Sequence, residues 1–273
     1  MTPLPIHIAS GGDLLMGQYQ AAAPAGAARG PTALDPPRSA VLMCNPFGQE
    51  AIRCHRAFRL LAALLARHGI PSLRFDYYAT GDSPGNDGEG ELSRWKRDIA
   101  AAHQALAVRC GSEDIVWLGL RLGACLALEA PILVERAPRR IVLWDPVTDG
   151  MRYLEALSRQ HAFWTRRHGV ADEALGFLLP QRLRAQVAAI DLPAMIAATS
   201  QPVAMVVGAQ VDGGARLVEG MAARQPSAAV AITGETTEWC SNEAMGTQWV
   251  PGEALDRLLD FVRPDEPPPE TRR

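Results

Sequence analysis

The chain has 273 residues with a formal net charge of -3, and 48% of its residues are hydrophobic and 21% charged. This is the composition of a soluble globular protein, and a charge of this size gives no reason to expect nucleic acid or an anionic membrane as a partner. The five cysteines form no C-x-x-C pair, which argues against a disulfide framework or a metal site. We therefore expect a cytoplasmic protein with no metal, no cofactor and no membrane span.

Apolar runs typical of buried strands occur at 39–45, 71–78, 114–120, 140–147, 202–209 and 227–233. Helical patterns separate most of them, at 54–69, 91–110, 122–136 and 253–262. This alternation predicts an α/β fold with a mostly parallel central sheet and helices on both of its faces. Residues 21–38, rich in Ala, Pro and Gly, are expected to form a surface loop, and residues 264–273 a disordered tail.

The alternation breaks once, at residues 150–200, where the sequence has helical patterns and no strand. We expect this segment to be a short helical cap inserted into a single core domain formed by residues 1–149 and 201–263. In open α/β folds ligands bind at the carboxyl edge of the sheet, so the cap is expected to cover that edge.

The stretch GDSPG, at 81–85, matches the G-x-S-x-G pattern of serine hydrolases. The residue after a nucleophilic serine must donate its backbone N–H to the oxyanion hole, and a helix must begin there. Pro84 has no N–H, and the turn-rich sequence NDGEGE follows. Ser83 is therefore not predicted to be a nucleophile.

The segment DIVWLGLRLGACLALEA, at 114–130, has the features that GDSPG lacks: an apolar strand, a G-x-x-x-G turn and an immediate helix. Gly119 and Gly123 allow the strand and the helix to approach without a Cβ between them. In an α/β hydrolase the middle of this turn carries the nucleophile. In this chain it carries Arg121.

The chain as a whole resembles the α/β-hydrolase superfamily, and more closely the exosortase A system-associated hydrolases. The resemblance covers roughly residues 39–262 and depends on CNPFGQEAIRCHRAFRLLA (44–62), LRFDYYATGDSPG (73–85), LGLRLGA (118–124), LWDPV (143–147) and ALGFLLPQRLRAQVAAIDL (174–192). It implies the eight-strand hydrolase topology with a small helical lid.

The resemblance also implies the places of the catalytic groups. The N–H groups of Phe47 and Leu122 would form the oxyanion hole, and Asp212 or Asp145 would be the catalytic acid. The general base would be a histidine within GETTEWCSNEAMG, at 234–246, but that stretch has none, and Glu238 or Trp239 stands at its place by spacing. Because an arginine cannot act as a nucleophile, Ser-His-Asp chemistry is not expected.

Two interpretations of Arg121 stay open. It is either a clamp for a carboxylate or phosphate ligand, or half of a structural ion pair with Glu238, Asp145 or Asp212 that fills the site. Thiol nucleophiles at Cys44, Cys125 or Cys240 are weaker candidates, because no histidine is expected beside them. The further candidates for substrate binding are Asn45, Tyr77, His161, Trp164, His168 and Trp239.

Three functions remain possible on this evidence. The first is a pseudo-hydrolase or non-hydrolytic enzyme of a biosynthetic pathway that binds a small acyl or anionic molecule in the hydrolase pocket. The second is an accessory interaction protein of an exosortase or exopolysaccharide system, with a homodimer or a pathway protein as its partner. The third is an esterase or thioesterase with an unconventional nucleophile.

Overall fold

The computed structural model describes residues 2–23, 39–166, 172–208, 221, 228–235, 239 and 251–263. The predicted tail and most of the predicted loop at 21–38 lie outside these residues. Within the described part, no helix is long and apolar enough to cross a lipid bilayer.

The centre of the fold is an eight-stranded sheet with the strand order β1-β2-β4-β3-β5-β6-β9-β10. Its strands are β1 (Leu4–Ser10), β2 (Asp13–Gln20), β3 (Ala40–Cys44), β4 (Ser72–Phe75), β5 (Ile115–Leu120), β6 (Arg140–Trp144), β9 (Val203–Gly208) and β10 (Ala229–Thr233). The β1–β2 hairpin is antiparallel and pairs antiparallel with β4, whereas all the remaining pairs are parallel. The predicted fold class, a mostly parallel α/β sheet, is confirmed.

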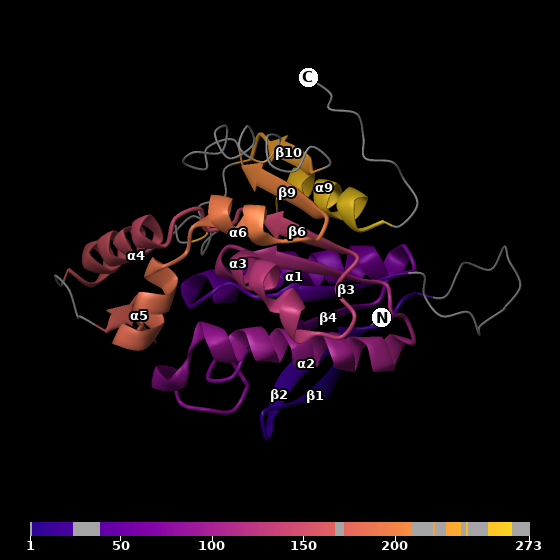
Figure 1. The fold of residues 1–273 in the computed structure, drawn as a ribbon, viewed down its shortest axis with the longest axis horizontal. Helices are drawn as coiled ribbons and strands as arrows, with labels where there is room; N and C mark the ends of the chain where they lie inside the picture. Colours follow the sequence, from indigo (N-terminus) through magenta and orange to yellow (C-terminus); the bar gives the residue numbers. More distant parts are fainter. Residues whose placement is uncertain are drawn as a thin grey trace, which may run out of the picture.

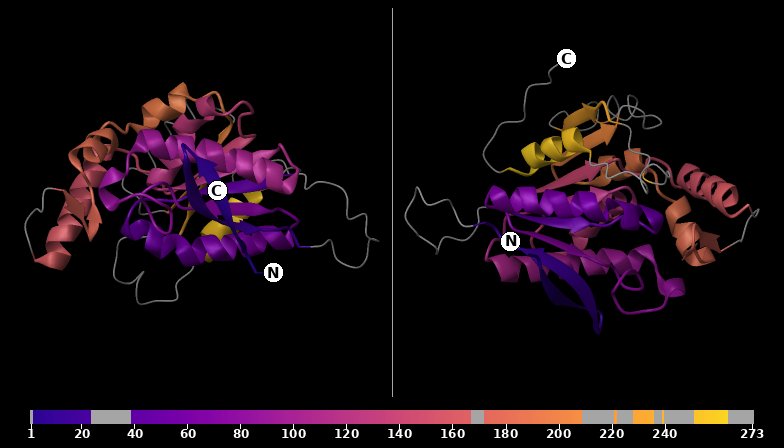
Figure 2. Two further views of the ribbon diagram at one scale, coloured as in Figure 1. Left: turned by 90° about the horizontal axis from the view of Figure 1, so that it is seen from below. Right: turned by 180° about the vertical axis from the view of Figure 1, so that it is seen from behind.

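Helices cover both faces of the sheet and form two apolar cores (Figures 1 and 2). Helices α1 (Gln49–Arg67) and α9 (Gly252–Val262) pack on one face, and α2 (Leu92–Cys110) and α3 (Leu122–Glu129) pack on the other. Short 3-10 turns lie at η1 (Asp87–Glu89) and η2 (Ala130–Leu133). Helix α3 ends at Glu129, before the predicted residue 136, and the chain continues as the 3-10 turn η2, where Pro131 has no N–H to donate to a further α-helical hydrogen bond.

The segment between β6 and β9 contains α4 (Gly150–Thr165), α5 (Gln181–Ala188) and α6 (Leu192–Ala198). It also contains a hairpin of β7 (Glu173–Ala174) and β8 (Phe177–Leu178), so the expectation of no strand here was wrong. Asp149 and Asp191 each accept a hydrogen bond from the backbone N–H three residues later, which caps α4 and α6. The two residues also pair with each other, which joins the two ends of the segment.

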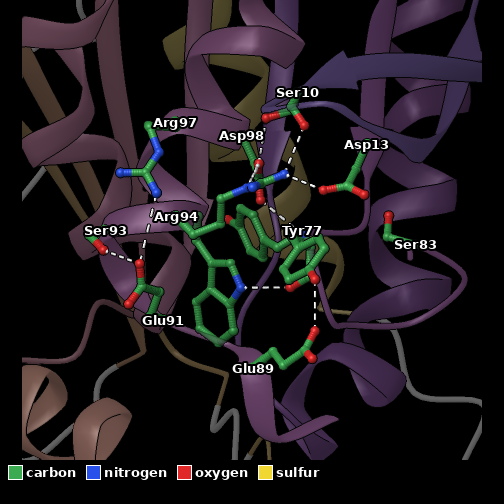
Figure 3. Close-up of polar contacts among 12 residues, drawn as sticks. Ser10, Asp13, Tyr77, Ser83, Glu89, Glu91, Ser93, Arg94, Arg97 and Asp98 are labelled. Carbon is green, nitrogen blue, oxygen red and sulfur yellow. Dashed lines mark hydrogen bonds and ion pairs between the residues drawn. The ribbon is translucent and has the colours of Figure 1, made fainter. Parts of the chain in front are cut away.

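A network around the buried Asp98 attaches the β1–β2 hairpin to α2 (Figure 3). Its Oδ1 accepts hydrogen bonds from Ser10 Oγ at 2.6 Å and Arg94 Nε at 3.2 Å, and its Oδ2 accepts one from the N–H of Tyr78 at 2.9 Å. Arg94 also donates to the carbonyl oxygen of Ser10 and to Asp13. One carboxylate therefore holds together the hairpin turn, the loop after β4 and α2.

We expect Asp98→Ala to lower the free energy of unfolding by about 3–5 kcal/mol, because it leaves a guanidinium and two other donors without their buried acceptor. The matched control is Asp13→Ala, which removes a partly exposed acceptor of the same arginine and should cost about 1 kcal/mol or less. Urea unfolding of both variants measures the difference. Equal losses would contradict the assignment of Asp98 as the centre of the network.

His103 is buried between α2 and the sheet, where its Nδ1 accepts a hydrogen bond from Trp117 Nε1 at 2.9 Å. Burial lowers the pKa of this histidine to about 4. The unfolded chain therefore takes up a proton on residue 103 between about pH 6.5 and 4, whereas the folded chain does not. This group stabilises the fold fully above that window, and its contribution is lost as the pH falls through it.

The His103→Gln variant keeps an acceptor for the indole but cannot take up a proton. Between pH 7 and pH 4 we expect the wild type to lose about 3 kcal/mol more stability than this variant. Urea unfolding at both pH values gives the two losses, and the carboxylates contribute equally to each. Identical losses would show that residue 103 becomes protonated within the folded protein.

Candidate functional site

The turn between β5 and α3 has a conformation that non-glycine residues rarely adopt. Arg121, its middle residue, has φ 53° and ψ -119°. A Cβ on Gly119 would lie 2.5 Å from the Cα of Ala124, and one on Gly123 would overlap the carbonyl oxygen of Cys44. The two glycines therefore allow the close approach that the sequence predicted, and the turn is a strained strand-to-helix elbow.

The side chain of Arg121 forms a buried ion pair with Glu50, in the first turn of α1. Arg121 Nε lies 2.8 Å from Glu50 Oε1, and the hydroxyl of Tyr153, on α4, donates to Glu50 Oε2 at 2.8 Å. The Glu50 side chain is 2% exposed and that of Arg121 is 21% exposed. Desolvation, the largest single influence, would lower the pKa of Arg121, but Glu50, Tyr153 and Asp145 together outweigh it and hold this pKa above its usual value.

The acid that pairs with Arg121 differs from those that the sequence predicted. Of the three expected carboxylates, Glu238 and Asp212 lie outside the described residues. Asp145 gives Arg121 only its main-chain oxygen, which accepts from Nη1 at 3.1 Å. Its carboxylate instead accepts from the N–H of Gly208 and from Trp239 Nε1, both at 2.9 Å. Direct pairing of the Asp145 carboxylate with Arg121 was therefore a wrong expectation, and Glu50 has this role.

Trp239 is 6% exposed and packs edge-on against Trp144, with 5.0 Å between the ring centroids. Its carbonyl oxygen accepts a hydrogen bond from Arg53 at 3.3 Å. One connected set of hydrogen bonds beside the elbow joins five described residues, Trp239, Asp145, Arg121, Glu50 and Tyr153. This arrangement favours the ion-pair interpretation of Arg121 over the ligand clamp.

Asn45 and Tyr77 lie on the other side of the elbow, at the ends of β3 and β4. Asn45 Nδ2 donates to the carbonyl oxygen of Phe75 at 2.7 Å, and the Tyr77 hydroxyl donates to the carbonyl oxygen of Asn45 at 3.2 Å. The Tyr77 ring stacks on Trp95 at 5.4 Å. These contacts fix the loop that carries Phe47, one of the two predicted oxyanion donors.

The candidates from the segment between β6 and β9 lie away from Arg121. His161 is 3% exposed, and its Nδ1 accepts a hydrogen bond from the N–H of Leu175 at 3.1 Å. It stands two turns of α4, about 12 Å, beyond Tyr153, the residue of this helix that contacts Glu50. Trp164 is exposed and packs edge-on against Phe163. His168 lies outside the described residues.

The alternative nucleophiles are enclosed by protein. Ser83 donates to the carbonyl oxygen of Asp76 at 2.6 Å and accepts from the N–H of Met16 at 3.0 Å, which is a structural role. Burial raises the pKa of Cys125 to about 12 and that of Cys44 further still, so neither forms the reactive thiolate near pH 7. Cys240 lies outside the described residues. In the part of the chain that the structure covers, no cluster of three His, Cys, Asp or Glu side chains is arranged to hold a metal ion.

A cavity of about 840 Å³ lies at the carboxyl end of β4, next to the elbow. Its lining includes Asn45, Phe47 and Tyr77, but none of the residues of the ion pair around Arg121. The apolar wall is formed by Phe47, Tyr77, Trp95, Phe177, Leu178 and Leu183, and the basic wall by His55, Arg59 and Arg74. This cavity, bounded by described residues, is therefore not the pocket expected around Arg121.

No protein-family model matches the chain, and no curated protein matches it either. Solved structures do match over nearly the whole length. A proline iminopeptidase from Mycobacterium smegmatis aligns with 95% of this chain and 97% of its own, with a TM-score of 0.64 and 12% identity. An esterase from Pyrococcus furiosus aligns over 95% and 89%, with a TM-score of 0.62 and 16% identity. The chain has an α/β-hydrolase fold.

A third similar structure, a serine hydrolase without a lid from Xanthomonas campestris, aligns over 98% of both chains with a TM-score of 0.58 and 12% identity. At these identities the likeness concerns the fold.

Truncating the arginine at the elbow tests the ion pair. Arg121→Ala leaves the carboxylate of Glu50 buried without its cation, so we expect the free energy of unfolding to fall by about 3–5 kcal/mol. The matched control is Arg159→Ala on α4, which breaks an exposed pair with Glu155 and should cost about 1 kcal/mol or less. If both variants lose equally little, the Arg121 pair does not support the fold.

Proposed function

We propose that this chain binds a small acyl-type or anionic molecule and does not hydrolyse it by Ser-His-Asp chemistry. The observation that carries the proposal is Arg121 at the elbow, ion-paired to Glu50 at 2.8 Å. A guanidinium stays protonated near neutral pH and cannot attack a carbonyl carbon.

The place of the general base supports the same conclusion. In a catalytic triad an imidazole N–H donates to a buried aspartate, while the other ring nitrogen takes the proton of the nucleophile. Here Trp239 Nε1 donates to Asp145 Oδ2 at 2.9 Å, from the loop where the resemblance places the histidine. An indole can donate this hydrogen bond but has no second nitrogen to accept a proton. The hydrogen bond that would orient a histidine on Asp145 is therefore present, but the residue that makes it cannot act as a general base.

The predicted oxyanion donors remain part of the proposal. Leu122 is the first residue of α3, and Phe47 belongs to the loop after β3. The tight contact of Gly123 with the main chain of Cys44 and Asn45 brings the two backbone segments together. Two N–H groups at these places suit a carbonyl or carboxylate oxygen of a bound ligand without any need for catalysis.

A second candidate is the accessory interaction protein, which three exposed apolar side chains on α4 favour. Met151, Phe163 and Trp164 are 55%, 72% and 44% exposed. Exposed aromatic and methionine side chains are enriched at protein interfaces. Either a second copy of this chain or a protein of an exosortase-type pathway would fit this candidate, with the cytoplasm as the compartment of both.

The hydrolytic alternative gives a direct test. A fluorophosphonate probe, which labels activated serines, should leave the wild type unlabelled. Arg121→Ser should neither become labelled nor hydrolyse p-nitrophenyl esters above the uncatalysed rate, because no base among the described residues reaches the new hydroxyl. A folded esterase from the same superfamily serves as the positive control. Labelling of the wild type, or rapid ester turnover by Arg121→Ser, would contradict the proposal.

A further inference from the structure

A second arginine, Arg74, lines the 840 Å³ cavity. Arg121 has an anionic partner in Glu50, and Arg74 differs from it in this respect. Arg74 is 8% exposed, and within the described part of the chain its guanidinium has no hydrogen bond or ion pair with protein. Burial, the largest influence, lowers the pKa of Arg74. A buried guanidinium without an anionic partner is costly, so its place in a cavity wall indicates a partner that comes from outside the chain.

The sheet fixes the direction of this side chain. Arg74 lies in β4 opposite Gln18 of β2 and Met43 of β3, and its neighbours Leu73 and Phe75 belong to the apolar core on the α2 side. Because side chains alternate across a strand, Arg74 points to the α1 side. His55 and Arg59 of α1 line the cavity there with it.

The nearest acid does not neutralise Arg74 by direct contact. The carboxylate of Asp76 accepts hydrogen bonds from Asn45 Nδ2 at 3.3 Å and from the N–H of Asp82 at 3.0 Å. Burial, as the largest influence, raises the pKa of Asp76. Asp82 and Asp87, which also line the cavity, are exposed to solvent. The basic wall therefore retains one buried cation that can bind an anion.

We propose that the cavity binds an amphipathic monocarboxylate, with its carboxylate on Arg74 and its apolar part against the wall that contains Phe47, Trp95 and Phe177. The inference rests on the proposed function and names the class of ligand. The planar guanidinium fork matches a carboxylate in two parallel hydrogen bonds. A phosphate monoester, with up to two negative charges near pH 7, would need a second buried cation, and Arg59 is exposed.

The test compares three probes with the same eight-carbon chain: octanoate, 1-octanol and octyl phosphate. Calorimetric titration at pH 7.5 should show that the wild type binds octanoate more than about tenfold more tightly than either of the others. Arg74→Met should weaken octanoate binding about 30-fold or more and leave octanol binding unchanged, because only the carboxylate loses its partner.

Two further variants keep the result interpretable. Arg159→Met removes an exposed arginine that does not line the cavity, and it should leave octanoate affinity within about threefold of the wild type. Arg74→Lys keeps the charge but loses the fork, so it should fall between the wild type and Arg74→Met. If Arg74→Met does not fold, the test depends on Arg74→Lys and on the preference of the wild type for octanoate over the other two probes.

The outcomes separate the two proposals. Equal affinity of the wild type for octanoate and octanol would overturn the role of Arg74 and leave binding in the cavity standing. Tighter binding of octyl phosphate would overturn the carboxylate as the ligand class. Binding of none of the three would contradict both the assignment of Arg74 and the proposed binding of an acyl-type ligand.

Discussion

The ion pair between Arg121 and Glu50 is the interaction on which the architecture of the site depends. The elbow projects its middle side chain toward the carboxyl edge of the sheet, where the N-termini of α1 and α3 already favour negative charge. A guanidinium at this point needs an anion close by. Glu50 supplies it from the first turn of α1, where a carboxylate also favours the helix dipole. Tyr153 then joins α4 to the same carboxylate at 2.8 Å.

Much of the fold could be predicted from the sequence, because continuous apolar strands and amphipathic helices have clear patterns. All six predicted strand segments contain strands of the sheet. The β1–β2 hairpin was not recognised, although Gly11 and Gly12 between two half-apolar segments are a hairpin signal. The β7–β8 hairpin has two residues in each strand, too few for any periodicity to show.

The site was harder to predict, because its central contact joins residues that are 71 positions apart. The two glycines and Arg121 marked the elbow correctly. Glu50 was missed because the search for an acid followed the places where hydrolases keep their catalytic groups, after the later strands. A carboxylate in the first turn of the helix after β3 was a signal in the sequence, since that helix also begins at the carboxyl edge of the sheet. Arg74 was missed because an arginine in a four-residue strand gives no pattern until its neighbours are known.

Arg121 and Arg74 together indicate how a chain with a hydrolase fold could bind an anion without hydrolysing it. Arg121 has its anion within the chain, at the elbow, whereas Arg74 lines the cavity with its positive charge uncompensated by direct contact. The most direct test of this account is a double-mutant cycle with Arg121→Met and Glu50→Leu, followed by urea unfolding. Because each single change strands a buried charge and the double change removes both charges, we expect a coupling energy of about 1.5–3 kcal/mol and a double variant more stable than either single one. Single losses that add to within about 0.5 kcal/mol would contradict the account.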